Sequence, residues 1–255
     1  MTKLSTAEKH TYLQEVILPS FAPAINQPIF SCLFDENLEI VICTNQSANS
    51  IGLANWQEAV GKGYKDTPNL AKKICGDKYT AENQEEIHKY ATTILQIQHK
   101  VFQNKQVVSF FDLLPYNGTF KSYLVTYTPI FHANGEVIAL QSFAHESKFF
   151  GFQEHFFQLA SDPLTKKYRT EKNLSRRETE VMFLLANGLT QEHIAKTLGL
   201  SRSSIAAVIA NQLSEKFNIP GANTQLLSKI AIEAGYFEQI PESLYRPFVV
   251  SLLPE

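Results

Sequence analysis

The feature that most constrains the fold is a run of short helices between Asn173 and Tyr236, each with its own start and stop signals. Ser175 and Glu178 have capping-box spacing, in which a serine and a glutamate three residues later bond each other's free backbone amides. Further capping signals follow along the run, with N-cap residues at Thr190 and Ser201 and helix-ending glycines at Gly188 and Gly199. These local signals predict three short helices, and a fourth from about Thr224 to Ala234.

The apolar residues of this run recur at helical spacing, which predicts one shared core. They are Val181, Leu184, Leu185, Ile194, Ala195, Leu198, Ile205, Ile209 and Leu213. A tight turn at Gly199 joins the second and third helices. Two helices joined in this way, with the third free to enter a major groove, are typical of a helix-turn-helix DNA-binding domain.

The residue pattern of the segment resembles the LuxR/GerE type of helix-turn-helix over about 60 residues. The matching positions are Leu174, Ser175, Arg177, Glu178, Glu180, Val181, Leu184, Leu185, Ala186, Gly188, Leu189, Thr190, Glu192, Ile194, Ala195, Leu198, Leu200, Ser201, Ser204 and Ile205. The resemblance implies a sequence-specific, DNA-binding transcription regulator of the bacterial type, and not an enzyme.

The same resemblance assigns the base-reading positions of the third helix to Ala206, Ala207 and Ala210, where relatives often have lysine at the first position. Alanine can offer only apolar contact, for example to a thymine methyl group. The remaining candidates for DNA contact are polar: Arg202, Ser203, Ser204 and Asn211, with Thr190, Gln191 and Lys196 near the backbone. The segment from Asn211 to Ile219 is also one residue longer than in the family.

The charge of this region predicts weak binding by a single domain. Residues 170–240 contain seven Lys or Arg and seven Glu, whereas phosphate contacts dominate affinity for DNA. We therefore expect a homodimer that binds two half-sites, with the fourth helix as partner surface through Leu227, Ile230, Ala231 and Ala234. The alternative is a protein-interaction or ligand-binding regulator whose helix-turn-helix no longer reads DNA directly.

The first part of the chain predicts a five-stranded antiparallel sheet with helices inserted between its second and third strands. Strand-like runs occupy 29–34, 38–44, 106–115, 120–131 and 137–145, with a short helix at 46–53, an irregular stretch at 54–79 and a long helix capped by Thr80. This order resembles a PAS domain, as do Asn45, Ala48, Leu53 and Val60-Gly61-Lys62. The fold class is therefore α+β, with a C-terminal all-α domain.

Aromatic residues in the first domain suggest a small-molecule pocket between sheet and helices. The candidates are Phe30, Cys32, Phe34, Tyr64, Phe102, Phe110, Tyr123, Tyr127 and Phe143. The alternative is a filled aromatic core. The sequence does not identify a ligand or cofactor, and it predicts no metal site: His88 and His99 lie about three turns apart on one helix, too far to share a metal.

These observations divide the chain into a PAS-like sensor or dimerisation domain at 1–148, a linker helix and basic linker at 149–172, the LuxR-type domain at 173–240 and an apolar tail at 241–255. The tail contains Val249, Val250, Leu252 and Leu253, so we expect it to dock on the first domain or on a partner.

Several classes are excluded by missing signatures. The chain has no GxSxG, GxxxxGK[ST], GxGxxG or HExxH motif, so no catalytic residues are predicted. Its three cysteines lack metal-site spacing, and no apolar run is long enough to span a membrane. We expect a cytoplasmic protein with double-stranded DNA as its partner.

Overall fold

The computed structural model describes residues 3–81, 83–147, 173–237 and 240–252. The chain forms two compact units: residues 1–148 together with 246–255, and residues 149–245. The linker expected at 149–172 lies outside the described residues. Each unit is described below by itself.

The first unit is built on one antiparallel sheet with the strand order β2-β1-β5-β4-β3-β6. Its first five strands are β1 (Phe30–Phe34), β2 (Ile40–Cys43), β3 (Val108–Tyr116), β4 (Thr119–Phe131) and β5 (Val137–Glu146). The helices that cover the inner face of the sheet lie between β2 and β3 in the chain. The PAS-like strand order expected from the sequence is confirmed.

The turn between β3 and β4 fixes the register of the longest strand pair. Asn117 and Gly118 both have positive φ, at 46° and 78°, the conformation that a two-residue hairpin turn requires. The pairing then runs from Tyr116 opposite Thr119 to Val108 opposite Tyr127. Because side chains alternate along a strand, this register places Phe110, Asp112, Tyr123 and Tyr127 on the same face.

That inner face is covered by α3 (Asn45–Ser50), η3 (Trp56–Ala59), η4 (Tyr64–Asp66), α4 (Thr67–Cys75), η5 (Gly76–Lys78) and the long α5 (Gln84–Asn104). Helix α5 buries Ile87, Ile94 and Val101 against the sheet. Two expectations are wrong here. Helix α4 lies in the stretch predicted to be irregular, and α5 begins after Asn83 rather than after Thr80.

The outer face is covered at β1, β2 and β5 by an N-terminal helical segment. It comprises α1 (Thr6–Tyr12), η1 (Leu13–Ile17), α2 (Leu18–Phe21) and η2 (Ala22–Ala24). Ser5 caps α1 and forms a capping box with Glu8. Leu13, Ile17 and Phe21 pack on Leu33 and Ile138, which makes a second core on this side of the sheet.

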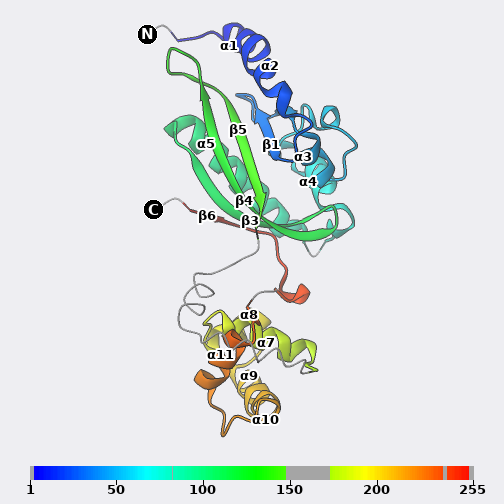
Figure 1. Cartoon of the computed structure of the whole chain (residues 1–255), viewed down its shortest axis with the longest axis vertical. Helices are drawn as coiled ribbons and strands as arrows, with labels where there is room; N and C mark the ends of the chain where they lie inside the picture. The colour runs from blue at the N-terminus through cyan, green and yellow to red at the C-terminus, as the bar shows by residue number, and fades with distance from the viewer. Residues whose placement is uncertain (1–2, 82, 148–172, 238–239, 253–255) are drawn as a thin grey trace. The chain divides into compact units, whose positions relative to one another are not determined.

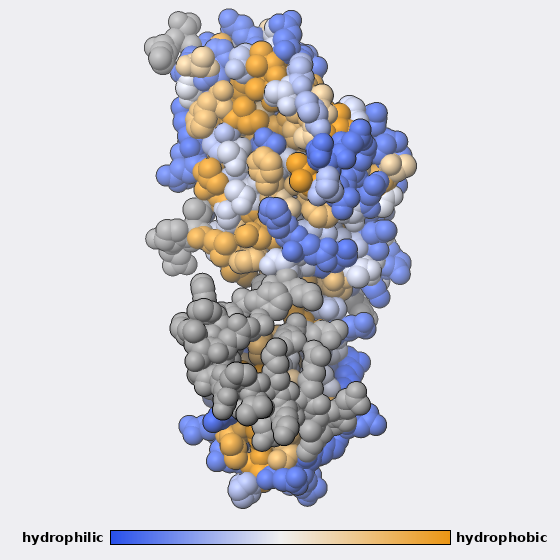
Figure 2. Space-filling model, in the orientation of Figure 1, coloured by the Kyte–Doolittle hydropathy of each residue, from blue (hydrophilic) through white to orange (hydrophobic). Residues whose placement is uncertain are grey.

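A sixth strand, β6 (Phe248–Ser251), comes from the C-terminal tail and pairs antiparallel with β3. Figure 1 shows it beside β3, and Figure 2 shows apolar side chains gathered over this edge. The tail therefore docks on the sheet of the first unit. Val249 packs against the inner core, while Val250 and Leu252 are about half exposed, at 49% and 48%.

The second unit is helical. Its elements are α7 (Arg176–Ala186), α8 (Gln191–Leu198), α9 (Arg202–Val208), η7 (Ile209–Leu213), α10 (Ser214–Lys216), α11 (Thr224–Glu233) and η8 (Glu242–Leu244). The predicted caps of α7, α8 and α9 are present at Ser175, Thr190 and Ser201. Gly199 ends α8 with a φ of 64°. Within the described part of the chain, no helix has both the length and the apolar character of a membrane span.

Candidate functional site

The second unit holds its third helical segment, α9 with η7, by an apolar stripe on one side. Ile205, Ile209 and Leu213 have no solvent exposure and pack with Val181 and Ile194. The hydroxyl of Ser201 accepts the backbone N–H of Ser204, which starts the segment directly after the turn at Gly199. With one side fixed in the core, the opposite side is presented to solvent.

The presented side carries every candidate that the sequence assigned to this helix. Arg202, Ser203, Ser204, Ala207 and Asn211 are exposed. Ala206 and Ala210 are half-buried. No carboxylate occurs from Arg202 to Ser214, and Arg202 is the single charged residue of that stretch. The surface is therefore weakly positive, and its hydrogen-bond donors lie on the polar residues and not at the three alanines.

The residues expected near the DNA backbone have different surroundings. Thr190 accepts the backbone N–H of His193 and so acts as the cap of α8. The amide of Gln191 donates to the Thr224 hydroxyl at 2.7 Å, which ties α8 to the start of α11. Lys196 is exposed. Of these three, Lys196 is the side chain free to reach a phosphate.

A π turn lies where the segment from Asn211 becomes one residue longer than the family pattern. The backbone N–H of Ser214 bonds the carbonyl of Ile209, five residues back. A π turn accommodates one inserted residue within a helix. As a result Leu213 stays in the core, and the chain beyond it resumes with Ile219 buried.

Two buried carboxylates on the first helix of this unit, α7, form ion pairs. The amine of Lys216 lies 2.7 Å from Glu178 Oε2, and Arg177 lies 2.8 Å from Glu180 Oε2. Burial acts to raise the pKa of Glu178, but the hydrogen bonds from Lys216 and Ser175 outweigh it and hold that pKa below its usual value. The Lys216 pair joins α10, which follows the third helical segment directly, to α7.

The four residues expected at a dimer surface divide into two groups. Leu227 and Ala231 have no solvent exposure and belong to the core of the second unit. Ile230 and Ala234 are half-buried, and Leu226 is 37% exposed. Any partner surface on α11 therefore uses the turn that carries Leu226 and Ile230 rather than Leu227 and Ala231.

The first unit contains a cavity of about 110 Å³ between the sheet and its inner helices. The lining residues are Phe30, Cys32, Phe34, Ile40, Ser47, Ser50, Ile51, Tyr64, Leu70, Ile74, Tyr90, Phe110, Asp112, Tyr116, Tyr123, Val125, Tyr127, Ser142 and Ala144. Seven of the nine residues proposed from the sequence are in this set. Phe102 packs at the edge of the core instead, and Phe143 is 39% exposed because β5 turns Ser142 and Ala144 inward.

The cavity is built around the carboxylate of Asp112, which has no solvent exposure. Its Oδ2 accepts the hydroxyl protons of Tyr116 at 2.6 Å and Tyr90 at 3.0 Å, and its Oδ1 accepts the backbone N–H of Tyr123 at 3.0 Å. Burial raises the pKa of Asp112 to about 6, against the opposing effect of these hydrogen bonds. Burial likewise raises the pKa of Tyr90 and Tyr116 well above the ordinary tyrosine value.

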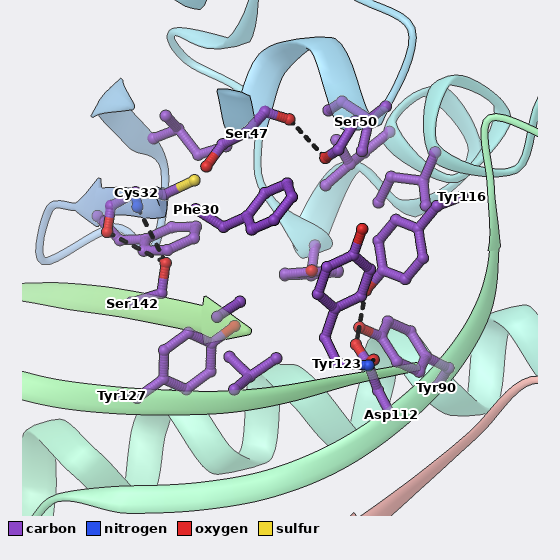
Figure 3. Close-up of a pocket in the computed structure, with 18 of the residues that line it drawn as sticks. Phe30, Cys32, Ser47, Ser50, Tyr90, Asp112, Tyr116, Tyr123, Tyr127 and Ser142 are labelled. Carbon is purple, nitrogen blue, oxygen red and sulfur yellow. Dashed lines mark hydrogen bonds between the residues drawn. The ribbon is translucent and has the colours of Figure 1, made fainter. Parts of the chain in front are cut away.

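Tyr123 supplies a second polar feature. Its ring is 3% exposed, yet its hydroxyl has no hydrogen-bond partner. Figure 3 shows this hydroxyl directed into the cavity near Phe30 and Tyr116. A buried hydroxyl without a partner is costly, so this atom marks a place that a bound molecule could satisfy.

Asp112, Tyr90 and Tyr116 were not identified from the sequence, although a signal for two of them was present. Phe110 was placed inward on its strand, and the period of two places Asp112 and Tyr116 on that same face. Tyr90 lies among the buried, mostly apolar positions of α5, so the helical spacing does not single it out. Among the described residues, no three His, Cys, Asp or Glu side chains are grouped as a metal site would require.

Comparisons with known proteins agree with the folds of the two units. Residues 172–225 match the family model described as bacterial regulatory proteins, luxR family. The Vibrio cholera VqmA–ligand–DNA complex is similar over 94% of this chain and 97% of its own, with 21% identity and a TM-score of 0.64. The phage VqmA–DPO complex is similar over 98% and 100%, with 20% identity and a TM-score of 0.61. At these identities the likeness establishes a shared fold. No curated protein sequence matches the chain.

Proposed function

We propose that this chain, a LuxR-type DNA-binding transcription regulator with a PAS-like first unit, binds DNA as a homodimer and senses a small molecule in the cavity of that unit. The observation that carries the proposal is the presented side of the third helical segment. It is free of carboxylates, begins at Arg202 and is held by a fully buried stripe on its other side.

Direct base readout by this helix is limited to few groups. Arg202 can contact a phosphate or a guanine, and Asn211 can contact an adenine or the backbone. Ala206, Ala207 and Ala210 can contribute only apolar contact. Because each half-site contact is weak, useful affinity requires two copies on two half-sites about 34–36 Å apart or a multiple of that distance.

Ligand sensing is supported by the cavity and by the related complexes. The Vibrio cholera protein was crystallised with a ligand and DNA, and the phage protein with DPO. In this chain the cavity contains a buried carboxylate and a hydroxyl without a partner, which are the kind of polar groups that orient a bound molecule.

A mobility-shift titration of the purified full-length protein on genomic fragments tests the DNA-binding part. We expect retardation that weakens steeply as salt increases, together with a dimer in sedimentation at tens of micromolar. Absence of any shift at low salt, with folded protein, would contradict direct DNA binding. A protein that stays monomeric throughout would contradict the two-half-site arrangement.

The three alanines favour a second candidate function, in which the helix-turn-helix domain contacts another regulator instead of DNA. This candidate predicts no retardation at low salt for the free protein, and the same result for Arg202→Ala. The first candidate predicts that Arg202→Ala reduces the affinity that the wild type shows. The pair of measurements separates the two functions.

A further inference from the structure

Several polar groups that line the cavity of the first unit can act toward a guest only as hydrogen-bond acceptors. The protons of five lining hydroxyls are already donated to protein atoms. Tyr90 and Tyr116 donate to Asp112, Ser50 donates to the carbonyl of Ser47, and Ser142 donates to the carbonyl of Cys32. The Ser47 hydroxyl is bonded to Thr44 and to the backbone of Ser31, while Thr44 itself donates to Ile29. What these groups have left for a bound molecule is lone pairs.

The charge in the cavity is negative, which also favours a hydrogen-bond donor as guest. Asp112 is the single charged type in the lining, which contains no Lys, Arg or His. A buried carboxylate without a nearby cation is costly, even when hydroxyls bond it. A positively charged guest would supply the counter-charge that the described lining residues do not contain.

The walls are aromatic, and aromatic faces attract cations. Phe30 and Tyr123 meet edge to face with ring centroids 5.1 Å apart, and Tyr116 meets Tyr123 at 4.9 Å. Tyr64 packs against Tyr90 at 6.0 Å. Proteins recognise ammonium groups in aromatic cages, where the cation lies over the negative faces of the rings.

From these observations we propose that the cavity recognises a small, ring-sized organic amine in its protonated form, with the ammonium group directed to the Tyr123 hydroxyl and the Asp112 cluster. The volume limits the guest to about one ring, since this cavity measures about 110 Å³ and is smaller than the engineered cavity of about 150 Å³ that accepts benzene. The inference deepens the sensing role proposed above and depends on it.

The test uses three probes of nearly equal shape with the full-length protein: benzylammonium, neutral benzyl alcohol and anionic benzoate. By calorimetric titration at about pH 7.5, we expect benzylammonium to bind about tenfold more tightly than benzyl alcohol, and benzoate not to bind. A neutral or anionic probe that binds as well as benzylammonium would overturn the ammonium assignment while leaving a sensing cavity in place. If none of the three binds, and native mass spectrometry finds no retained molecule, the assignment and the sensing role both fail.

Two variants locate the recognition. Asp112→Asn removes the charge at constant shape, and Tyr123→Phe removes a hydroxyl that has no protein partner. We expect each to reduce benzylammonium affinity about tenfold or more and to leave benzyl alcohol less affected. Tyr12→Phe is the matched control, because Tyr12 packs on the outer face of the sheet. Unchanged benzylammonium binding in both cavity variants would overturn the proposal.

The pH dependence provides a further test that a purely steric cavity would not pass. The titratable groups near Asp112 are the tyrosines at positions 90 on α5, 116 on β3 and 123 and 127 on β4, with Tyr64 of η4 bonded to Tyr90. None of these tyrosines titrates in the acidic range. Benzylammonium affinity should therefore fall between about pH 7.5 and about pH 5, as Asp112 takes up a proton. An affinity independent of pH over this range would contradict the carboxylate's role.

Discussion

Val249 of the C-terminal strand β6 lies directly opposite Asp112 of β3 in the antiparallel sheet of the first unit. The two residues are far apart in the sequence, with the whole helix-turn-helix region between them. Val249 packs against the inner core, and Asp112 is the carboxylate of the cavity. The strand that follows the helix-turn-helix region is thus part of the sheet that lines the candidate sensor site.

The first prediction concerns this strand. Val249→Ala removes two methyl groups that pack on the inner core, and should destabilise the first unit by about 1–2 kcal/mol. Val250→Ala, at an outward position that is 49% exposed, should change stability by less than about 0.5 kcal/mol. Chemical unfolding followed by the fluorescence of Trp56, the one tryptophan of the chain, reports on this unit. Equal effects of the two variants would show that β6 contributes no inward packing.

The second prediction concerns the pH dependence of stability. The pKa of Asp112 is about 6 in the folded protein, against an ordinary value of 3.8, so the folded state keeps this proton over a range where the unfolded state has lost it. Asp112 therefore contributes up to about 3 kcal/mol to the free energy of unfolding. This contribution is complete below about pH 4 and is lost as the pH rises through about 6.

Asp112→Asn removes this titration and should flatten the pH profile of the Trp56-monitored unfolding relative to wild type. The informative quantity is the difference between the two profiles, since other groups titrate in both proteins. Parallel profiles from pH 4 to pH 7 would show that the folded carboxylate titrates normally.

The third prediction concerns the presented side of the third helical segment. Ala206→Lys adds a cation where members of the family often have one, and should increase DNA affinity and steepen the salt dependence by about 0.9 in the log–log slope. Arg202→Ala should act in the opposite direction. Ala133→Lys, in an exposed turn of the first unit, adds the same charge elsewhere. If it strengthens binding as much as Ala206→Lys, the effect is due to net charge and not to this helix.

The fourth prediction concerns the π turn. Deleting Gln212 should let Ser214 bond Ile209 as an ordinary α-helical turn, because the deletion shortens the present five-residue span to four. We expect the second unit to keep its helix content and to lose less than about 1 kcal/mol. Deleting Lys196 from α8, where no π turn exists, should instead move Leu198 and the cap at Gly199 out of register and unfold the unit. Circular dichroism on thermal unfolding distinguishes these outcomes.

Much of the helix-turn-helix region could be predicted from the sequence because its determinants are local. Each cap depends on residues three positions apart, such as Ser175 with Glu178, and the stop at Gly199 depends on one backbone conformation. The five-strand order of the first unit was predictable for a similar reason, since turns such as Asn117-Gly118 act at short range.

The errors arose where local signals conflict with packing. Helix α4 begins at Thr67 and contains Pro68, a residue that signals irregular structure but is well tolerated in the first turn of a helix. Phe143 was assigned inward because it is aromatic, but the strand is buried on both faces from Val137 to Leu140, so its alternation could not be read from hydrophobicity. Leu227 was placed at a partner surface, yet it fills the core of its own unit.

The sequence by itself determined the helices of the helix-turn-helix region, the alanine-rich face of its third segment and the resemblance of both units to known families, because these depend on neighbours within a few positions. Only the tertiary structure decided that Asp112 lies among Tyr90, Tyr116 and Tyr123, and that β6 joins β3. The reason is physical: a carboxylate's environment and a sheet's edge pairing are set by residues distant in the chain, and burial becomes defined only when those segments pack together.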